Sequence, residues 1–233
     1  MLKIKRNKII EKWFDQKVNI LDVLKLVKYN QVKYNHFLFI KDIDFYTIHI
    51  NLEEQENSIF KNFKKNTKYE INRAKREGAK IFHLTLSKEE YLNYYNAFAK
   101  TKNLSILSDR EISYYWDNLI ILGGGISEDT INVINSYLVN GHRARLFHSI
   151  SIFRYSENIN KNFAGMVNRF LHWEAMKYFK KNDYKIYDLG GISKIKATEN
   201  IAKFKLNFSN NIVKEYNLIS PLLFLLLKLK GYK

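Results

Sequence analysis

The chain contains no cysteine, a single proline and only nine glycines among its 233 residues. The absence of cysteine excludes disulfide bonds, thiolate catalysis and metal sites built from thiolates. Because proline and glycine are scarce, we expect no long flexible linker, and one domain or one domain with an appended lobe. Hydrophobic residues make up 46% of the chain and aromatic residues 15%, which is enough for a sizeable core.

Long hydrophobic runs are also missing. No apolar run reaches the length of a membrane span, and the basic start Met1–Arg6 lacks the apolar segment of a signal peptide. We therefore expect a cytoplasmic protein. The apolar segment Leu218–Leu229 ends among lysines and favours either packing on the protein's own core, contact with the inner face of an anionic membrane, or a contact with a second copy. The oligomeric state stays open.

Acidic residues are few in comparison with basic ones: 23 against 39, which gives a net charge of +16. One interpretation is a phosphate-rich partner, such as tRNA, a nucleotide-linked sugar, coenzyme A or an anionic membrane. The other is a general preference for Lys and Asn, because the excess is spread over much of the chain. The composition supports both.

Hydrophobic spacing and turn signals predict the order of the elements. Helices are expected over residues 1–35, 58–78, 88–100, 109–122 and 163–181 and after Ser220-Pro221. Strands are expected over residues 36–41, 45–52, 79–84, 131–139, 142–153, 184–189 and 214–217. Asp42-Ile43-Asp44 is expected to form a hairpin turn, Asn140-Gly141 a type I′ turn, and Gly123-Gly124-Gly125 a flexible loop.

This order of elements predicts an α+β fold with a mostly antiparallel central sheet flanked by helices. We divide the chain into an N-terminal helical extension over residues 1–35, a main domain over residues 36–217 and a C-terminal apolar and basic helix over residues 218–233. His83, His142 and His148 fall in strand-like segments without the spacing of metal ligands, so no metal site is expected.

The most informative segment joins an apolar-periodic helix containing His172 to a short strand that ends in Tyr187-Asp188-Leu189-Gly190-Gly191. Such a junction places a carboxylate at the end of a strand, beside backbone that a ligand can approach closely. Asp188 could orient or deprotonate an amine. It could equally be a turn residue that binds the amides of Gly190 and Gly191.

Two further segments accompany this junction: the basic stretch from Lys64 to Gly78, which contains Ala74-Lys75-Arg76-Glu77-Gly78, and Phe204-Lys205-Leu206-Asn207-Phe208. In this order and at these separations, the three segments resemble the FemABX aminoacyltransferase family, whose members are variants of the GNAT acyltransferase fold. The resemblance covers roughly residues 45–216. Typical members carry two GNAT-like halves, whereas this chain has room for one half and an extension.

The resemblance implies a GNAT-like fold and an N-acyltransferase that moves an aminoacyl or acyl group onto a primary amine of a cell-wall or surface-glycan precursor. No tightly bound cofactor is implied, and the co-substrate is aminoacyl-tRNA or acyl-CoA. The usual pyrophosphate-binding pattern of coenzyme A-dependent enzymes is missing between Arg154 and Gly165, where Asn160, Asn162 and Gly165 could serve only in part. An acetyl-CoA-dependent N-acetyltransferase acting on an amino-sugar or small amine, and a non-catalytic RNA- or membrane-binding module, are the alternatives.

The candidate site follows from the same segments. The candidate catalytic residues are Asp188, His172 and Tyr187. The candidate residues for binding substrate or donor are Lys68, Tyr69, Arg73, Gly190, Gly191, Lys205, Asn160 and Asn162. A packed histidine and a solvated basic helix are the competing interpretations of His172 and of the Lys68–Arg73 face.

Overall fold

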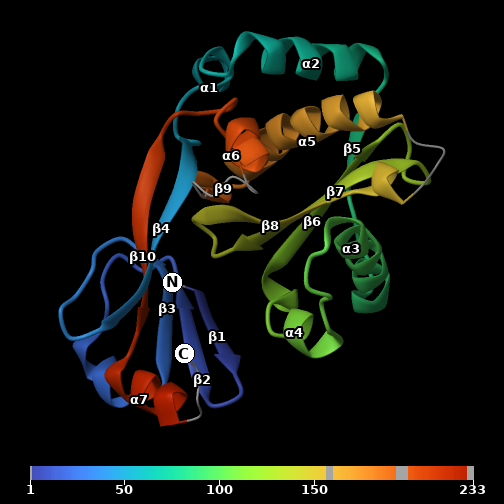
Figure 1. Cartoon of the computed structure of the whole chain (residues 1–233). Helices are drawn as coiled ribbons and strands as arrows, with labels where there is room; N and C mark the ends of the chain where they lie inside the picture. Colours follow the sequence, from blue (N-terminus) through green and yellow to red (C-terminus); the bar gives the residue numbers. More distant parts are fainter. Residues whose placement is uncertain (1, 156–159, 193–198, 230–233) are drawn as a thin grey trace. The chain divides into compact units, whose positions relative to one another are not determined.

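The computed structural model describes residues 2–155, 160–192 and 199–229 (Figure 1). The chain divides into two compact units. The terminal unit comprises Met1–Ile48, Gly191–Ala202 and Asn211–Lys233, and the central unit comprises His49–Gly190 and Lys203–Asn210. Strand β4 (Ile40–Asn51) runs from the terminal unit into the central unit.

The terminal unit is built around a twisted sheet. Its strands follow the order β1 (Leu2–Arg6), β2 (Ile9–Trp13), β3 (Val27–Val32), β10 (Ile212–Ile219) and β4. The β2–β3 pair is parallel and the others are antiparallel. The 3-10 helix η1 (Ile20–Leu24) connects β2 to β3, and α7 (Pro221–Leu229) follows β10. Val27, Tyr29, Val32, Phe39 and Leu218 form its buried core.

The predicted helix over residues 1–35 is wrong, since this segment forms three strands and one 3-10 helix. β-Branched residues at positions such as Ile4 and Val27 favour extended backbone, and pairing with β10, nearly two hundred residues away, completes the strand arrangement. Both predicted terminal segments, residues 1–35 and 218–233, have their described parts in the terminal unit.

The predicted hairpin at Asp42-Ile43-Asp44 is also wrong. β4 continues through these residues and pairs with β10 from Ile40 to Ile48. Asp44 lies on this strand within 3.2 Å of Lys41 Nζ and 3.1 Å of Lys214 Nζ. The acid therefore balances neighbouring lysines on a strand and does not make a turn.

The central unit contains a second strand arrangement, in the order β9 (Ile186–Ile192), β8 (Arg143–Ser151), β7 (Ile131–Val139), β6 (Leu119–Gly125) and β5 (Lys80–His83). Only the β8–β9 pair among these is parallel. In Figure 1, α2 (Lys65–Arg76) and α5 (Lys161–Lys181) cover one face, and α3 (Lys88–Lys102) and α4 (Asp109–Ser113) lie on the other.

The remaining described helices are short. They are α1 (Glu56–Lys61), η2 (Trp116–Asn118), η3 (Ile152–Arg154) and α6 (Glu199–Lys205). Tyr91 of α3 packs with Ile112 of α4 and with isoleucines of β6 and β7 on one face of the sheet. The arrangement is a mixed α+β fold with mostly antiparallel strands and flanking helices, which confirms the predicted fold class.

Several predicted elements are confirmed: the hairpin of β7 and β8, the helices α3 and α5, the strands β5 and β10, and the final helix, which Ser220 caps through a bond from the Leu223 amide. The β7–β8 turn departs from type I′, because only Gly141 of the predicted pair has a positive φ. The predicted helix over 58–78 is two helices, α1 and α2. α1 begins at Glu56 and α2 ends at Arg76, so the helical segment starts and ends two residues earlier than predicted.

The predicted helix over 109–122 and the predicted loop at Gly123-Gly124-Gly125 are wrong. The helix α4 stops at Ser113, and β6 begins at Leu119 and includes all three glycines. A Cβ on Gly124 would lie 2.8 Å from Val167 Cγ1 of α5, and one on Gly125 would lie 2.1 Å from the carbonyl oxygen of Thr130. These glycines therefore allow close packing in a buried strand.

Candidate active site

Asp188 lies where two parallel strands diverge. β8 and β9 pair over three residue pairs, from Arg143 opposite Ile186 to Arg145 opposite Asp188. β8 then continues to Ser151 in register with β7. The two strands therefore separate immediately after the pair that contains Asp188. The ends of the paired segment therefore define the candidate site in the central unit.

The Asp188 carboxylate is fully buried and lies among cations. Its Oδ2 accepts hydrogen bonds from Nε and Nη2 of Arg143, with Nε at 3.0 Å. Arg145 Nε and His49 Nε2 each lie 4.0 Å from the same oxygen. A carboxylate held by a guanidinium is stabilised as the anion, so it is a weak proton acceptor.

The other Asp188 oxygen closes a local turn with Gly190, but β9 continues past it to Ile192, so the predicted end of the strand at this point is wrong. Oδ1 accepts the Gly190 amide at 2.8 Å, which is one of the two bonds that the turn interpretation predicts. Gly190 has a φ of +76°, and a Cβ there would lie 3.0 Å from the Leu146 carbonyl oxygen and 3.5 Å from Lys205 Nζ. Glycine at this position therefore allows the turn and the close approach of Lys205.

Lys205 is a buried lysine of α6 beside this turn. Burial lowers the pKa of Lys205 to about 8, and repulsion from Arg145 acts in the same direction, while attraction to Asp188 opposes both. Near neutral pH, most molecules therefore carry a protonated Lys205 side chain. The cluster thus contains a buried ammonium group beside the Asp188–Gly190 turn.

On the opposite face of β9, Tyr187 belongs to a buried chain of polar side chains. Asn135 Nδ2 donates to Tyr137 Oη at 3.3 Å, the two tyrosine hydroxyls lie 3.0 Å apart, and Tyr187 Oη lies 2.6 Å from His172 Nδ1. Burial raises the pKa of both tyrosines, so their hydroxyls stay neutral. If donation runs from Asn135 toward the histidine, His172 carries its proton on Nε2.

His172 is fully buried against the rings of Phe204 and Phe208. Burial lowers the pKa of His172 to about 3, with further repulsion from Lys205 and Arg169, so the imidazole is neutral at physiological pH. Among the described residues, its Nε2 has no hydrogen-bond partner. The structure therefore brings His172, Tyr187, Asp188, Gly190 and Lys205 into one region, and their functional roles stay predictions.

Gly191 belongs to the terminal unit, where a Cβ would lie 2.8 Å from Cζ of Phe45. Its lack of a side chain allows the Phe45 ring to pack against the strand. Any role in binding a donor stays a prediction.

The predicted basic face lies on the outer side of α2, whose buried side consists of Thr67, Ile71 and Ala74. Lys68 Nζ donates to the Lys61 carbonyl oxygen at 3.1 Å, and Arg73 Nε donates to Glu77 Oε1 at 2.6 Å. Tyr69 is exposed. No contact among the described residues joins Lys68, Tyr69 or Arg73 to Asp188, so these three form a separate surface.

Asn160 and Asn162 lie at the start of α5, and Ser156–Ile159 of the same predicted loop lie outside the described residues. Asn160 Oδ1 accepts the amides of Asn162 and Phe163 at 2.8 and 3.2 Å, so Asn160 is the helix cap. A pocket of about 640 Å³ adjoins this end and includes Glu128, Asp129, Asn132 and Phe163. Its described lining contains two acids and no Lys or Arg.

Sequence reasoning missed Arg143, Arg145 and Tyr137. The two arginines are two residues apart on β8, a spacing that places both side chains on one face of a strand. That spacing beside a predicted strand carrying Asp188 was a usable signal. Tyr137 had no such signal in the sequence, because an alternating apolar strand does not indicate which tyrosine hydroxyl will contact another segment of the chain.

Two kinds of feature are absent from the described residues: a helix able to cross a membrane and a group of metal-binding side chains. Within residues 2–155, 160–192 and 199–229, no helix combines the length and the apolar character needed to cross a membrane. Over the same ranges, no three or more His, Cys, Asp or Glu side chains are grouped so that they could hold a metal ion.

Comparison with known proteins identifies relatives of this fold. The FemAB family model matches residues 30–123. The crystal structure of FemX superposes with a TM-score of 0.62 at 9% identity, over 79% of this chain and 63% of that one. The chain therefore spans less than two thirds of FemX. A comparison with curated proteins returns no match.

Two further structures cover nearly the whole chain. The C-terminal domain of a putative lysylphosphatidylglycerol synthetase from Agrobacterium fabrum has a TM-score of 0.56 at 11% identity, covering 96% of this chain and 83% of that one. L-PGS from Bacillus licheniformis has a TM-score of 0.55 at 13% identity, covering 99% and 85%. The family match supports the resemblance to the FemAB family over residues 30–123, and the three superpositions show that the fold is shared.

Proposed function

We propose that the chain transfers an aminoacyl group from an aminoacyl-tRNA to a primary amine on a cell-wall or surface-glycan precursor. The observation that carries this proposal is the buried Lys205 ammonium beside the Asp188–Gly190 turn, at the point where β8 and β9 diverge. The FemAB family match supports the aminoacyl class. The reaction is placed in the cytoplasm, where aminoacyl-tRNA is made.

In the proposed reaction the amine nitrogen attacks the ester carbonyl carbon of the donor. The carbonyl oxygen gains negative charge, and the buried Lys205 ammonium stabilises it in a site of low dielectric. The neutral His172 offers its unpartnered Nε2 as a second polar contact near Phe204 and Phe208. Collapse of the intermediate breaks the ester bond, forms the amide, and moves the amine proton to the departing hydroxyl oxygen.

Asp188 has a positioning role in this scheme. Its carboxylate holds Arg143 and the Gly190 amide and attracts Lys205. Because Arg143 stabilises the Asp188 anion, this carboxylate is poorly suited to deprotonate the amine. The reaction then depends mainly on positioning and charge stabilisation, and no side chain needs to form a covalent intermediate.

The N-terminus of α5 favours a tRNA donor over acyl-CoA. Coenzyme A-dependent GNAT enzymes bind pyrophosphate there, but in this chain Asn160 Oδ1 already accepts two amides. Glu128 and Asp129 in the adjoining pocket would repel phosphate groups. The exposed lysines and arginine of α2 suit the phosphates of tRNA, and we propose that Lys68, Tyr69 and Arg73 contact them.

The experiment compares donors. Purified protein is mixed with a lysine-containing muramyl peptide linked to a nucleotide and with either radiolabelled aminoacyl-tRNA or radiolabelled acetyl-CoA. We expect label in the peptide only from aminoacyl-tRNA, and a higher KM for tRNA in Lys68→Gln/Arg73→Gln. Transfer from acetyl-CoA alone would support the acetyltransferase alternative. Salt-sensitive tRNA binding without transfer to any amine would support the non-catalytic module.

A further inference from the structure

The short helix η1 in the terminal unit exposes its hydrophobic residues and buries its acid. Ile20, Leu21 and Leu24 are 58%, 72% and 82% exposed, whereas Asp22 is only 2% exposed. Folding normally does the reverse, because burial stabilises apolar side chains and penalises charged ones. An apolar surface kept outside in this way calls for a ligand or partner.

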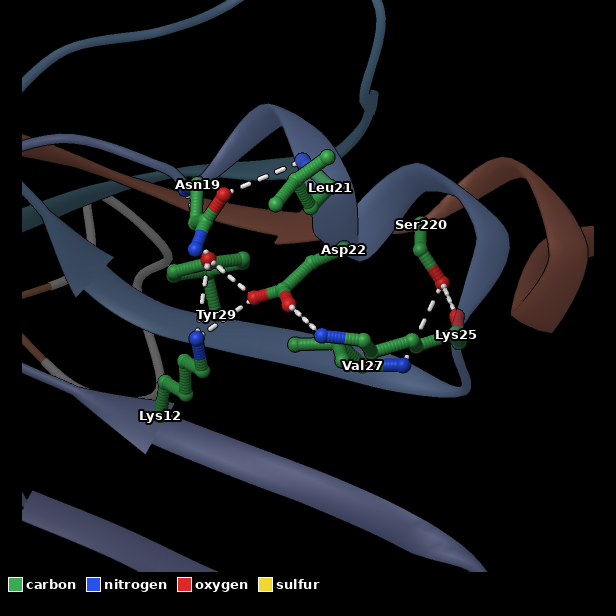
Figure 2. A network of polar contacts seen from close by, with 8 residues as sticks. All are labelled: Lys12, Asn19, Leu21, Asp22, Lys25, Val27, Tyr29 and Ser220. Atoms are coloured by element: carbon green, nitrogen blue, oxygen red, sulfur yellow. Dashed lines mark hydrogen bonds and ion pairs between the residues drawn. The ribbon is translucent and has the colours of Figure 1, made fainter.

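A buried polar network fixes this orientation of η1 (Figure 2). Asp22 accepts hydrogen bonds from Tyr29 Oη at 2.6 Å, from Lys25 Nζ at 3.2 Å and from Lys12 Nζ. Burial by itself would raise the pKa of Asp22, but these three donors together hold it below its usual value. The network holds Asp22 inside, and the neighbouring Leu21 and Leu24 side chains are exposed.

Helix α7 extends the same surface. Ser220, the residue before α7, donates to the Lys25 carbonyl oxygen at 2.6 Å and accepts the Val27 amide at 3.2 Å (Figure 2). These bonds fasten the start of α7 to the end of η1, and the two helices are in contact. Leu222, Leu225 and Leu229 of α7 are exposed as well. We call the six exposed residues of η1 and α7 the apolar ridge.

The charge around the apolar ridge has one sign. Lys17 and Lys25 flank η1, and Lys228 is exposed on α7. Asp22 is the only acid between residues 16 and 29, and the sequence has no acid between residues 218 and 233. Lys230 and Lys233 lie outside the described residues. Two copies of this surface would bring lysines against lysines, so the charge argues against self-association and favours an anionic partner.

We propose that the apolar ridge docks the protein onto an anionic lipid surface, with the leucines entering the interface and the lysines meeting lipid phosphates. Shallow insertion of exposed leucines together with attraction of lysines is the combination that holds peripheral proteins on membranes. This proposal is independent of the proposed transfer reaction. It adds η1 to the membrane contact that is one of the three alternatives for Leu218–Leu229 in the sequence analysis.

The test is vesicle flotation of the full chain with phosphatidylcholine vesicles, with and without phosphatidylglycerol. We expect binding to the anionic vesicles that weakens with salt, and a loss of at least about tenfold in the partition coefficient for Leu21→Gln/Leu24→Gln. The matched control is Leu104→Gln/Ile106→Gln, which changes two exposed apolar residues of the central unit and should bind normally.

Three results would overturn the proposal. One is equal flotation of the ridge variant and the control. Another is equal binding to both vesicle compositions, which would remove the role of the lysines. The third is a concentration-dependent dimer in sedimentation velocity that Leu21→Gln/Leu24→Gln abolishes, since the apolar ridge would then bind a second copy.

Discussion

At the scale of the residue, the Asp188 carboxylate takes part both in a local turn and in a buried ion pair. One carboxylate oxygen fixes the Gly190 amide, and the other holds Arg143. Arg143 lies in the first residue pair of β8 and β9, and Gly190 follows the last pair, so the Asp188 side chain links the two strands where their pairing stops. Because the Asp188 carboxylate is fully buried, the site needs this residue for its structure, whatever its role in catalysis.

Replacing Asp188 with Asn should therefore destabilise the protein. Asn can still accept the Gly190 amide, but it leaves the buried Arg143 guanidinium without this carboxylate, and breaking a buried ion pair costs about 3–5 kcal/mol. The measurement is the free energy of unfolding in urea. The double variant Asp188→Asn/Arg143→Gln should recover part of the loss. Unchanged stability with kcat lowered by about 10²–10⁴ would instead show that Asp188 is the general base.

His172 gives the protein a pH-dependent stability. In the unfolded chain a histidine binds a proton below a pKa of about 6.5, whereas burial keeps native His172 neutral down to a pKa of about 3. Between these values the unfolded state binds more protons, so the free energy of unfolding falls as the pH falls, by roughly 1.4 kcal/mol per pH unit for this group. Above pH 7 the contribution is constant.

Urea unfolding between pH 7 and pH 4 measures this dependence. His172→Gln should reduce the slope by about one proton. An unchanged slope in His172→Gln would mean that His172 becomes protonated in the native state.

At the scale of the element, short sequence signals predicted those helices and strands that are determined by neighbouring residues in the chain. The β7–β8 hairpin follows from Asn140-Gly141 between alternating strands, and α5 follows from its long apolar stripe. The N-terminal segment could not be predicted in this way. Its helix-like spacing relied on Ile20, Leu21 and Leu24 being buried, yet these residues are exposed and Asp22 is inside.

The candidate site shows the same division. Asp188 and Gly190 were predictable as a pair because an acid two residues before a glycine can accept its amide, although β9 continues through both residues to Ile192 and does not end there. The Tyr137–Tyr187–His172 chain was not, because it joins two strands and a helix whose pairing depends on the whole sheet. Its partners are set by tertiary packing and not by spacing along the sequence.

The glycines of β6 provide a test at this scale. A Cβ on Gly125 would lie 2.1 Å from the Thr130 carbonyl oxygen, and backbone cannot move aside cheaply. Gly125→Ala should lower the free energy of unfolding by about 1–3 kcal/mol or more, as overpacking does.

Gly78→Ala is the comparison for this variant. A Cβ on Gly78 meets nothing within 4 Å, although its φ is +83°, so the cost should be about 1 kcal/mol. Chemical denaturation of both variants decides the matter. A Gly125 variant as stable as the natural chain would mean that β6 does not pack as described.

At the scale of the whole molecule, two candidate sites with different chemistry belong to the two units. The central unit contains the buried Lys205 and Asp188, and the terminal unit contains the apolar ridge. The net charge of +16 serves both proposals, because tRNA and anionic lipid each present phosphates. High salt should therefore weaken both interactions, and only variants can separate them.

The central claim is that Lys205 stabilises the charge that develops during aminoacyl transfer. Its most direct test is the single-turnover transfer rate from radiolabelled aminoacyl-tRNA, for the natural chain, Lys205→Met and the matched control Lys203→Met, an exposed lysine of the same helix. We predict a loss of about 10²–10³ for Lys205→Met and a near-natural rate for the control. The natural rate should also decline above pH 8, where Lys205 loses its proton, and Lys205→Arg should move that decline to higher pH. Transfer by Lys205→Met at the natural rate would contradict the account.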